Sequence, residues 1–237
     1  MHQRSHRVDP AVRRRSKTAR TQARYDRIAP FYDRLEGMIE RLKFRAIRRM
    51  LWFEVPPGHG LEVGVGTGKN ISYYPDAAEV VAIDLSSRML EQSRERALSL
   101  GKAVDLRQMD VEHLAFRDDS FDWVASTFVF CSVPDPVAGL RELARVTKPG
   151  GRIFFLEHMR PRGKLLGFVF DLLNPFTVRV FGFNINRRTL ENIAAAGLKI
   201  QEHRALDPRG ILAMIVASPE KTQTESSVGI SSSGNML

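Results

Sequence analysis

The stretch LEVGVGTG, residues 61–68, decides the fold, because a short apolar strand runs here into three glycines and then a helical segment from Lys69. Glycine lets the backbone turn tightly and approach a ligand that any Cβ atom would hold away. Twenty residues after Gly64, Asp84 ends the next expected strand, where a carboxylate can accept hydrogen bonds from both hydroxyls of a ribose. The loop and this acid together predict a ligand that contains adenosine.

A dinucleotide site is the competing interpretation of such a loop, and three details argue against it. The third glycine is Gly68, whereas the dinucleotide motif places it one position later, where this chain has Lys69. Glu62 lies in the first strand beneath the loop, where it would repel a pyrophosphate. Asp110 ends the third expected strand, within reach of an adenine amino group. Acids on three successive strands favour a positively charged nucleoside.

Outside the loop, short apolar runs alternate with segments of helical periodicity. This alternation is typical of βαβ units and predicts a mostly parallel sheet with helices on both faces. Only a Pro-Arg-Gly turn at 208–210 joins the last two runs, which predicts an antiparallel hairpin at the edge of the sheet. The expected strands are 60–64, 80–84, 104–110, 121–128, 152–157, 200–204 and 211–217, and the expected helices are 87–100, 136–146 and 189–196.

Five motifs follow one another over residues 60–160: EVGVGTG at 62–68, VAID at 81–84, QMD at 108–110, SFDWV at 120–124 and VTKPGG at 146–151. In order and spacing they resemble the motifs of the class I S-adenosylmethionine-dependent methyltransferases. The resemblance implies an α/β fold with a Rossmann-like, seven-stranded mixed sheet, its last strand antiparallel and helices on both faces. It also implies a methyltransferase enzyme whose cofactor is S-adenosyl-L-methionine.

The resemblance further implies which residues surround the cofactor. The loop glycines would lie against the methionine moiety, Asp84 on the ribose and Asp110 by the adenine. Leu85 or Met89 would pack on the adenine face, although Met89 fits a plain core position in its helix equally well. The expected cofactor residues are Tyr25, Tyr32, Glu62, Gly64, Gly66, Gly68, Asp84, Leu85, Met89, Asp110, Val111 and Thr127.

Narrower motifs concern the acceptor. YDRIAPFYD at 25–33 resembles a segment of the ubiquinone/menaquinone C-methyltransferases and the bacterial phosphatidylethanolamine N-methyltransferases. In that subgroup the segment folds over the cofactor, so Tyr25 and Tyr32 are candidate lid residues or, equally, aromatic staples that hold the first helices to the sheet. STFVFCSVPD at 126–135 and FLEH at 155–158 resemble membrane-associated thiol methyltransferases. The acceptor is therefore expected to be a hydrophobic or amphiphilic small molecule, either a quinone precursor or a phospholipid amine, with a thiol or other small metabolite as the alternative.

Methyl transfer from a sulfonium depends on alignment and on the exclusion of water more than on a fixed catalytic triad. His158 follows the fifth expected strand, at the edge where ligands of open α/β sheets bind. It is the candidate catalytic residue for orienting or deprotonating the acceptor, with a structural role as the alternative. Cys131 is the single cysteine, which excludes an intramolecular disulfide and a Cys-based zinc site, and no metal is expected.

The chain has 237 residues and a net charge of +9, but residues 1–49 hold 15 Lys and Arg against 5 Asp and Glu. The rest of the chain is nearly neutral. The basic N-terminus suits an anionic membrane surface, whereas nucleic acid is disfavoured because no RNA-binding module accompanies the arginines. A cofactor-binding regulatory or RNA-associated module is the alternative of another class. The single cysteine and the lack of a bilayer-spanning stretch predict a cytoplasmic protein, peripheral to the membrane if the basic segment docks there.

Four regions are expected along the chain: a basic disordered arm at 1–20, amphipathic lid helices at 21–57, the methyltransferase domain at 58–218 and a disordered tail at 219–237. The domain includes an acceptor-side insertion at 159–188. In the lid helices an apolar row runs from Leu35 through Ile39, Leu42, Ala46 and Met50 to Phe53, with Arg41, Arg45, Arg48 and Arg49 on another face.

The insertion is rich in aromatic and basic residues. Five of the 14 phenylalanines lie within 160–188, namely Phe168, Phe170, Phe176, Phe181 and Phe183, and six Lys or Arg are interleaved with them. Apolar residues edged by cations suit an amphiphile with an anionic or polar head. We expect some of these phenylalanines to line an acceptor channel, and the alternative is a pair of core-capping helices whose phenylalanines face inward.

Overall fold

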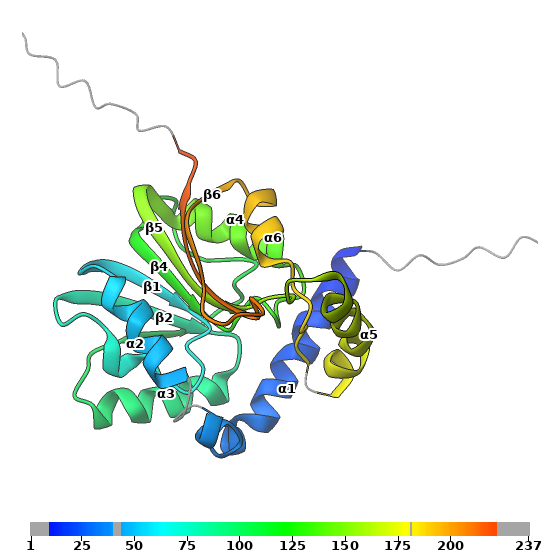
Figure 1. Ribbon diagram of the computed structural model, residues 1–237. Coiled ribbons are helices and arrows are strands. Elements are labelled where there is room, and N and C mark those ends of the chain that lie inside the picture. The colour runs from blue at the N-terminus through cyan, green and yellow to red at the C-terminus, as the bar shows by residue number, and fades with distance from the viewer. Residues whose placement is uncertain (1–9, 40–43, 181, 222–237) are drawn as a thin grey trace, which may run out of the picture.

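The computed structural model describes residues 10–39, 44–180 and 182–221. Its centre is a seven-stranded sheet in the order β3-β2-β1-β4-β5-β7-β6 (Figure 1). β7 is antiparallel to β5 and β6, and the other neighbouring strands are parallel, so the expected mixed sheet with its reversed last strand is confirmed. The strands are β1 Gly58–Val63, β2 Ala78–Asp84, β3 Asp105–Gln108, β4 Phe121–Thr127, β5 Thr147–His158, β6 Leu198–Ala205 and β7 Leu212–Pro219.

Helices cover both faces of this sheet, as the sequence predicts. On one face, Leu140 of α4 and Ile193 of α6 pack in a core with Val124 of β4. On the other face, Trp52 of α2 packs in a core with Trp123, the preceding residue of the same strand. Central strands that are buried on both faces consist of nearly continuous apolar residues, and for this reason they can be recognised in the sequence. The helices are α1 Pro10–Ile39, α2 Arg45–Glu54, α3 Ser87–Ser99, α4 Pro136–Val146, α5 Lys164–Val180 and α6 Thr189–Ala195, with a short 3-10 helix, η2, at Ile71–Tyr73.

Side chains cap the first turns of two helices that follow strands of the sheet. The Ser86 hydroxyl accepts a hydrogen bond from the Met89 amide at 3.2 Å, which begins α3 after β2. The Asp135 carboxylate accepts one from the Ala138 amide at 3.0 Å, which begins α4 in the loop after β4. Such caps satisfy amides that the first helical turn leaves without a partner. They fix the loops at one edge of the sheet.

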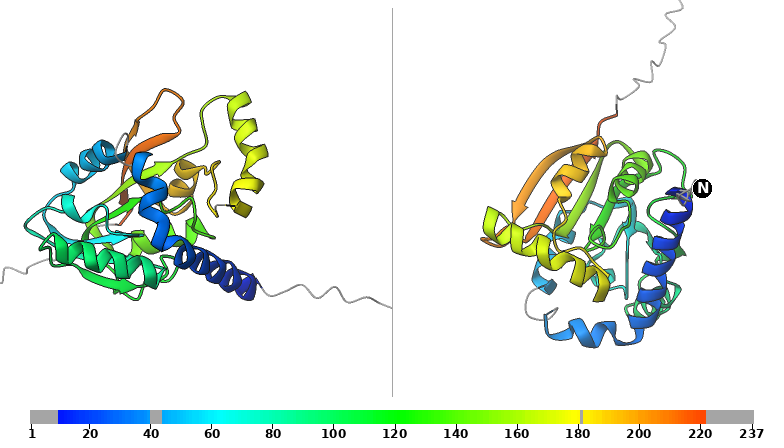
Figure 2. Two further views of the ribbon diagram at one scale, coloured as in Figure 1. Left: turned by 90° about the horizontal axis from the view of Figure 1, so that it is seen from below. Right: turned by 90° about the vertical axis from the view of Figure 1, so that its right-hand side faces the viewer.

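The N-terminal region differs from the expectation. α1 begins at Pro10, so a disordered arm at 1–20 is wrong for residues 10–20, while residues 1–9 lie outside the described part of the chain. Residues 10–20 include four Arg, two Ala and one Lys, which are strong helix formers even without apolar periodicity. α1 bends in its second half (Figure 2), and it contains Pro30, which removes a helical hydrogen bond.

The apolar row described from the sequence is not the buried face of α2. Phe53 is 91% exposed and Met50 is 45% exposed. Instead Leu51 and Trp52 are buried, and so is Arg48, which was expected on another face than the apolar row. Leu42, another member of the row, lies outside the described residues.

Two contacts explain this rotation of α2. The Trp52 ring meets Trp123 edge-on, with ring centroids 5.8 Å apart, so the largest side chain of the helix fills the core. Arg48 donates from Nη1 to the Asn70 side-chain oxygen at 3.1 Å, which satisfies a cation that burial would otherwise penalise. Periodicity alone does not reveal either partner.

The remaining parts of the chain lie at the periphery. β7 extends to Pro219, and most of the expected tail, residues 222–237, lies outside the described residues, as does Phe181 of the insertion. α5 occupies the insertion and stands at the side of the molecule (Figures 1 and 2). Among the helices of the described ranges, none is long and apolar enough to cross a bilayer.

Candidate functional site

A cavity opens at the carboxyl edge of the sheet, where β1, β2 and β4 end side by side. The register places Val63 beside both Ile83 and Ser126, so the loops that follow these residues converge. The cavity wall comes from the glycine loop, from the segments after β2, β3 and β4, and from α1 and α2. This is the edge at which ligands of open α/β sheets bind.

Most of the expected cofactor residues meet in this cavity. Ten of the twelve line it, namely Tyr25, Tyr32, Gly64, Gly66, Asp84, Leu85, Met89, Asp110, Val111 and Thr127. Glu62 and Gly68 do not line it, and neither does His158. The structure therefore brings together the glycine loop, the acids after β2 and β3 and the two tyrosines of α1.

The three glycines of the loop differ in what a Cβ atom would contact at each position. All three have positive φ, at 67° for Gly64, 56° for Gly66 and 78° for Gly68. A Cβ atom on Gly64 would lie 2.3 Å from the Val129 side chain, and one on Gly68 would lie 2.7 Å from Ile71. A Cβ atom on Gly66 would meet no atom within 4 Å. Gly66 therefore leaves open the space that a ligand needs, whereas Gly68 permits packing beneath the loop.

Asp84 joins the glycine loop to the start of α3. One carboxylate oxygen accepts a hydrogen bond from the Gly66 amide at 2.9 Å and the other accepts one from the Ser86 amide at 2.9 Å. Burial raises the pKa of Asp84 to about 6, although these amides oppose the rise. Each carboxylate oxygen has a second lone pair, so the group can still accept from two neighbouring hydroxyls.

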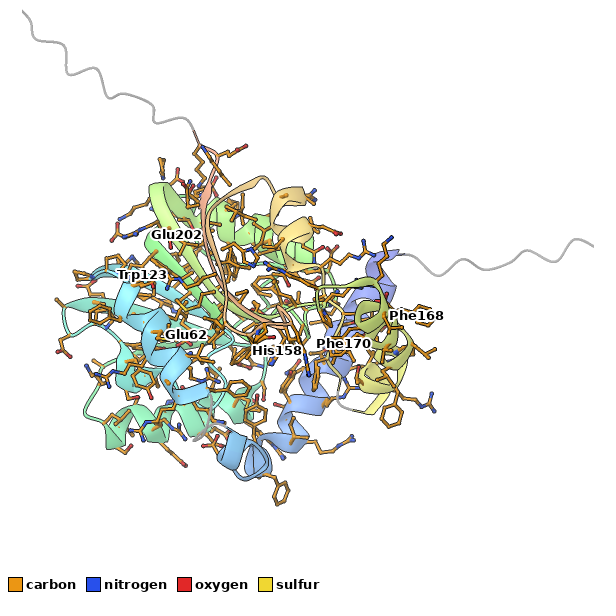
Figure 3. All side chains as sticks on the ribbon, in the orientation of Figure 1. Glu62, Trp123, His158, Phe168, Phe170 and Glu202 are labelled. Carbon is orange, nitrogen blue, oxygen red and sulfur yellow. The ribbon has the colours of Figure 1, made fainter. Side chains whose placement is uncertain are left out.

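Glu62 lies on β1 (Figure 3) and is fully buried within a polar network. It accepts hydrogen bonds from the Asn70 amide at 2.5 Å and from the Tyr74 hydroxyl. The Asn70 amide also lies 3.2 Å from Thr127 Oγ1, and its oxygen accepts from Arg48. Burial raises the pKa of Glu62 to about 7. Its influence on the cavity passes through Asn70, which does line the wall.

α1 crosses the cavity and is held by contacts on two sides. The Tyr25 hydroxyl lies 2.6 Å from Ser132 Oγ in the segment after β4. At the other side, Ser86 Oγ donates to Asp26 at 2.5 Å and Thr67 Oγ1 donates to Asp33 at 2.7 Å. These bonds connect α1 to three separate cavity loops.

Charges strengthen the contact at Asp33. Burial by itself raises the pKa of this carboxyl, but the Thr67 hydrogen bond and the charges of Arg96 and Lys69 hold it below its ordinary value. The ammonium of Lys69 lies 3.5 Å from Asp33 and 5.2 Å from the centroid of the Tyr32 ring. Asp33 therefore remains an anion that fixes α1 over the glycine loop.

His158 lies behind the cavity wall and not in it. Its ring centroid is 4.6 Å from that of Phe128 and 5.9 Å from that of Phe44. Phe128 does line the cavity, and the guanidinium of Arg48 lies 5.2 Å from its ring centroid. The expected acid-base role of His158 stays a prediction, and the geometry gives this histidine a direct contact with Phe128.

Phe128 adopts a backbone conformation that is rare for a bulky residue, with φ at 59°. Glu157 holds the segment that follows it, because Oε1 accepts from Ser126 Oγ at 3.0 Å and from the amides of Val129 at 3.1 Å and Phe130 at 3.3 Å. Burial raises the pKa of Glu157 to about 7. This acid therefore fixes the wall that carries Phe128.

Sequence reasoning missed several cavity residues. Arg48, Asn70, Phe128 and Val129 all line the wall. The buried side of α2 would have identified Arg48, but the apolar row pointed to the wrong face. Phe128 and Val129 follow β4 at the same edge as the glycine loop, so their position was the available signal. The described phenylalanines of the insertion, by contrast, do not line the cavity.

Comparisons with known proteins agree with this geometry. A family model described as a methyltransferase domain matches residues 61–155. The chain is 40% identical over 111 residues to a phosphatidylethanolamine N-methyltransferase of Cereibacter sphaeroides, and this match covers 46% of the chain but only 55% of that enzyme. It is 32% identical over 221 residues to a demethylmenaquinone methyltransferase of Clavibacter sepedonicus, covering 84% of the chain and 89% of that enzyme. The crystal structure of an S-adenosylmethionine-dependent methyltransferase from Thermotoga maritima shares the fold, with a TM-score of 0.64 at 22% identity over 84% of this chain and 99% of that chain.

Proposed function

The chain belongs to the class I S-adenosylmethionine-dependent methyltransferases, and from this premise we propose that it methylates a hydrophobic or amphiphilic small molecule. Its cofactor is S-adenosylmethionine. We propose a quinone precursor or a phospholipid amine as the acceptor, which the names of the two relatives support. The observation that carries the proposal is one cavity that runs from the glycine loop and Asp84 to the apolar side chains of Phe128, Val129 and Val133.

The residues of the cavity fit the cofactor. Gly66 leaves room where a Cβ atom would intrude, and Asp84 and Asp110 supply acceptors for a nucleoside. Lys69 and Arg48 put cations on another part of the wall, which suits the carboxylate of an amino acid. When bound, the cofactor supplies an electrophilic methyl group on a positively charged sulfur.

The segment after β4 would receive the acceptor. Phe128, Val129, Val133 and Pro134 make this part of the wall apolar. α1 covers the cavity through Tyr25 and would exclude water once both ligands are in place. In this arrangement the chain contributes alignment and a dry site, which is the main requirement of an in-line methyl transfer.

We assign His158 a positioning role through Phe128. If the imidazole only supports the Phe128 ring, then His158→Phe should keep most of the activity and the pH profile, whereas His158→Ala should lower kcat. If His158 is the acid-base group, both variants should lose activity and the pH profile should lose one limb. The pH profile of kcat with the preferred acceptor separates the two roles.

Two glycine variants test cofactor binding with a matched control. Gly66 and Gly101 have similar φ angles, 56° and 63°, and a Cβ atom on either would meet nothing within 4 Å. Gly66→Ala and Gly101→Ala should therefore cost similar stability, about 1 kcal/mol each. Only Gly66→Ala should weaken S-adenosylmethionine, by at least about tenfold, since that methyl group enters the cavity. Equal affinity in both variants, measured by titration calorimetry, would exclude this cavity as the cofactor site.

Product analysis tests the acceptor class. The full chain is incubated with methyl-labelled S-adenosylmethionine and either a short-chain quinone precursor or phosphatidylethanolamine in detergent. Mass spectrometry should find the label on one of these acceptors and should find none in the Asp84→Ala variant. Label transfer only to small hydrophilic thiols or amines would contradict the proposed class.

A further inference from the structure

α5 is an amphipathic helix with large apolar side chains on its outer face and polar side chains toward the body of the protein. Leu165, Phe168, Leu172 and Phe176 recur at helical spacing and are 80%, 63%, 69% and 62% exposed. Figure 3 places Phe168 on the outer side of the helix and Phe170 on the side toward the body. Large apolar side chains gathered on one exposed face mark a surface that meets an apolar environment.

The inner face of α5 carries polar side chains beside Phe170, and specific hydrogen bonds hold it in place. Asp171 receives bonds from Arg160 at 2.8 Å and from Asn186 at 3.0 Å. Asn174 donates to the Asn184 oxygen at 3.2 Å and accepts from the backbone amide of residue 185 at 2.9 Å. The exposed apolar face of α5, formed by Leu165, Phe168, Leu172 and Phe176, is called the apolar stripe here. The bonds of the inner face direct this stripe outward, so the fold itself determines its exposure.

Charge indicates what covers this stripe. The segment 160–188 carries six basic residues and one acidic residue, Asp171, which is paired with Arg160. Arg162, Lys164 and Arg179 are exposed around the two ends of the helix. An apolar helix face edged by Lys and Arg matches an anionic lipid surface, which accepts apolar side chains and attracts cations.

A second copy of the chain fits less well. A two-fold contact through α5 would place the same strongly basic segment of both copies face to face. The charges would then repel each other, whereas anionic headgroups would neutralise them. The charge pattern therefore favours lipid over self-association.

The segment that follows α5 is linked to the candidate active site. The Asn184 side chain and backbone amide both donate to the Cys131 carbonyl, at 2.9 and 2.8 Å, and Arg187 donates to the Val133 carbonyl at 2.5 Å. Val133 lines the cavity. On the α1 side, Arg24 packs so closely on Gly182 that a Cβ atom there would lie 1.6 Å from its Nη1. A surface bound through α5 would thus be close to the rim over which an amphiphile must enter.

We propose that the apolar stripe of α5, formed by Leu165, Phe168, Leu172 and Phe176, inserts into an anionic lipid surface and docks the enzyme there. The choice of lipid rests on the proposed function, because an amphiphilic acceptor resides in such a surface. The helix lies in the plane of the interface, with its apolar side chains among the acyl chains and its basic ends at the headgroups.

Vesicle flotation of the full chain tests the proposal with matched variants. Phe168→Glu/Leu172→Glu places two acids in the stripe, and Leu98→Glu/Leu100→Glu places two acids on exposed positions at the end of α3, 76% and 43% exposed. Figures 1 and 2 show α3 and α5 on different sides of the molecule. Both variants change the net charge equally, and both change only exposed side chains, so both should fold.

We expect the unsubstituted chain to float with phosphatidylcholine vesicles that contain phosphatidylglycerol and to bind pure phosphatidylcholine weakly. The α5 variant should reduce binding at least about tenfold and the α3 variant by no more than about twofold. Equal binding by both variants would overturn the proposal, as would failure of the unsubstituted chain to float. A dimer in sedimentation velocity that only the α5 variant dissociates would also overturn it and assign the stripe to a second copy.

A fluorescent variant locates the inserted helix. Phe168→Trp and Leu98→Trp each add an exposed indole, while the two native tryptophans, Trp52 and Trp123, are 2% and 0% exposed. Brominated lipids should quench only the Phe168→Trp emission, and quenching of neither would contradict insertion. Methylation in detergent is measured in parallel. Loss of α5-dependent flotation with methylation intact refutes the docking alone, whereas intact docking without methylation of any amphiphile refutes the proposed function alone.

Discussion

α4 and α5 lie on either side of β5 in the chain, and they arrange their apolar residues in opposite ways. α4 directs Leu140, Leu143 and Val146 into the core, where all are 0% exposed. α5 directs hydrogen-bonding groups such as Asp171 inward and keeps Leu172 at 69% exposure. The first helix is stabilised by burial within the chain, whereas the second leaves an apolar surface for an outside environment. A helix with an apolar stripe is therefore not automatically a core helix.

The largest expected effect is a difference in the free energy of unfolding when one leucine in each helix is truncated to alanine. Leu140→Ala removes a fully buried side chain and should lower the free energy of unfolding by about 3 kcal/mol, through lost burial and a residual cavity. Leu172→Ala should change it by less than about 0.5 kcal/mol because the side chain is already exposed. Urea unfolding of both variants measures the difference. Similar losses in the two would mean that α5 packs within the chain as α4 does.

The buried carboxyl of Glu157 should make the stability of the chain depend on pH. Burial raises the pKa of Glu157 from an ordinary 4.5 to about 7, so the folded chain retains a proton that the unfolded chain releases near pH 4.5. The contribution of Glu157 to stability is complete below about pH 4.5 and is lost as the pH rises through about 7. Glu157→Gln stays neutral at every pH. It should be more stable than the unsubstituted chain at pH 8 by on the order of 2 kcal/mol, and the gain should vanish near pH 4.5.

Urea unfolding of Glu157→Gln and of the unsubstituted chain at both pH values measures this gain. The difference between their free energies of unfolding does not include the effects of the other buried acids, because both proteins contain them. A gain of the same size at both pH values would show that shape or hydrogen bonding, and not ionisation, is responsible. Loss of stability at both would show that the three bonds to Oε1 dominate.

A smaller effect concerns the start of α4. Asp135 caps this helix by accepting from the Ala138 amide at 3.0 Å. Asp135→Ala should lower the free energy of unfolding by about 1 kcal/mol, whereas Asp135→Asn, which keeps a side-chain oxygen, should change it by only a few tenths. Thermal unfolding of the two variants measures the cap. Equal losses would indicate that the charge of Asp135, and not its bond to the first turn, stabilises α4.

The parts of the fold that could be predicted from the sequence are those in which each local signal agrees with the core. β1, β2, β4 and β5 are buried on both faces over most of their length and therefore contain apolar runs. α4 begins with Asp135 and Pro136, a recognisable cap. The glycine loop and Asp84 were predictable because a close approach of backbone to ligand leaves a specific residue pattern.

The rest depended on partners that are distant in the sequence. Arg48 is buried because Asn70 receives its hydrogen bond, and no periodicity within α2 indicates that partner. His158 stands at the expected edge, but Phe128 occupies the position at the cavity wall. In the insertion the phenylalanines and the interleaved basic residues were visible, yet this composition does not reveal which side of α5 faces the protein. That choice is made by Arg160 and Asn184, which lie outside the helix.

The smallest expected effect concerns Asp171, one of the side chains that determine which side of α5 faces the protein. Hydrogen bonds from Arg160 and Asn186 lower the pKa of this carboxyl to about 2. Its contribution is therefore present above the ordinary value of 3.8 and lost as the pH falls through about 2. Asp171→Asn should leave the midpoint of global unfolding unchanged, because exposed ion pairs add little. It should instead speed amide hydrogen exchange in α5 while exchange in α4 stays the same.

Asp105→Asn provides the matched control, since Asp105 forms an exposed ion pair with Arg107 on β3, an edge strand of the sheet. Faster exchange in α5 only for Asp171→Asn would mean that an inward polar bond holds the apolar stripe outward. Unchanged exchange in α5 would assign that role to Asn174 and the segment after the helix. In either case α4, whose position depends on buried leucines, should not respond, because its orientation is determined by the core and that of α5 by hydrogen bonds at its inner face.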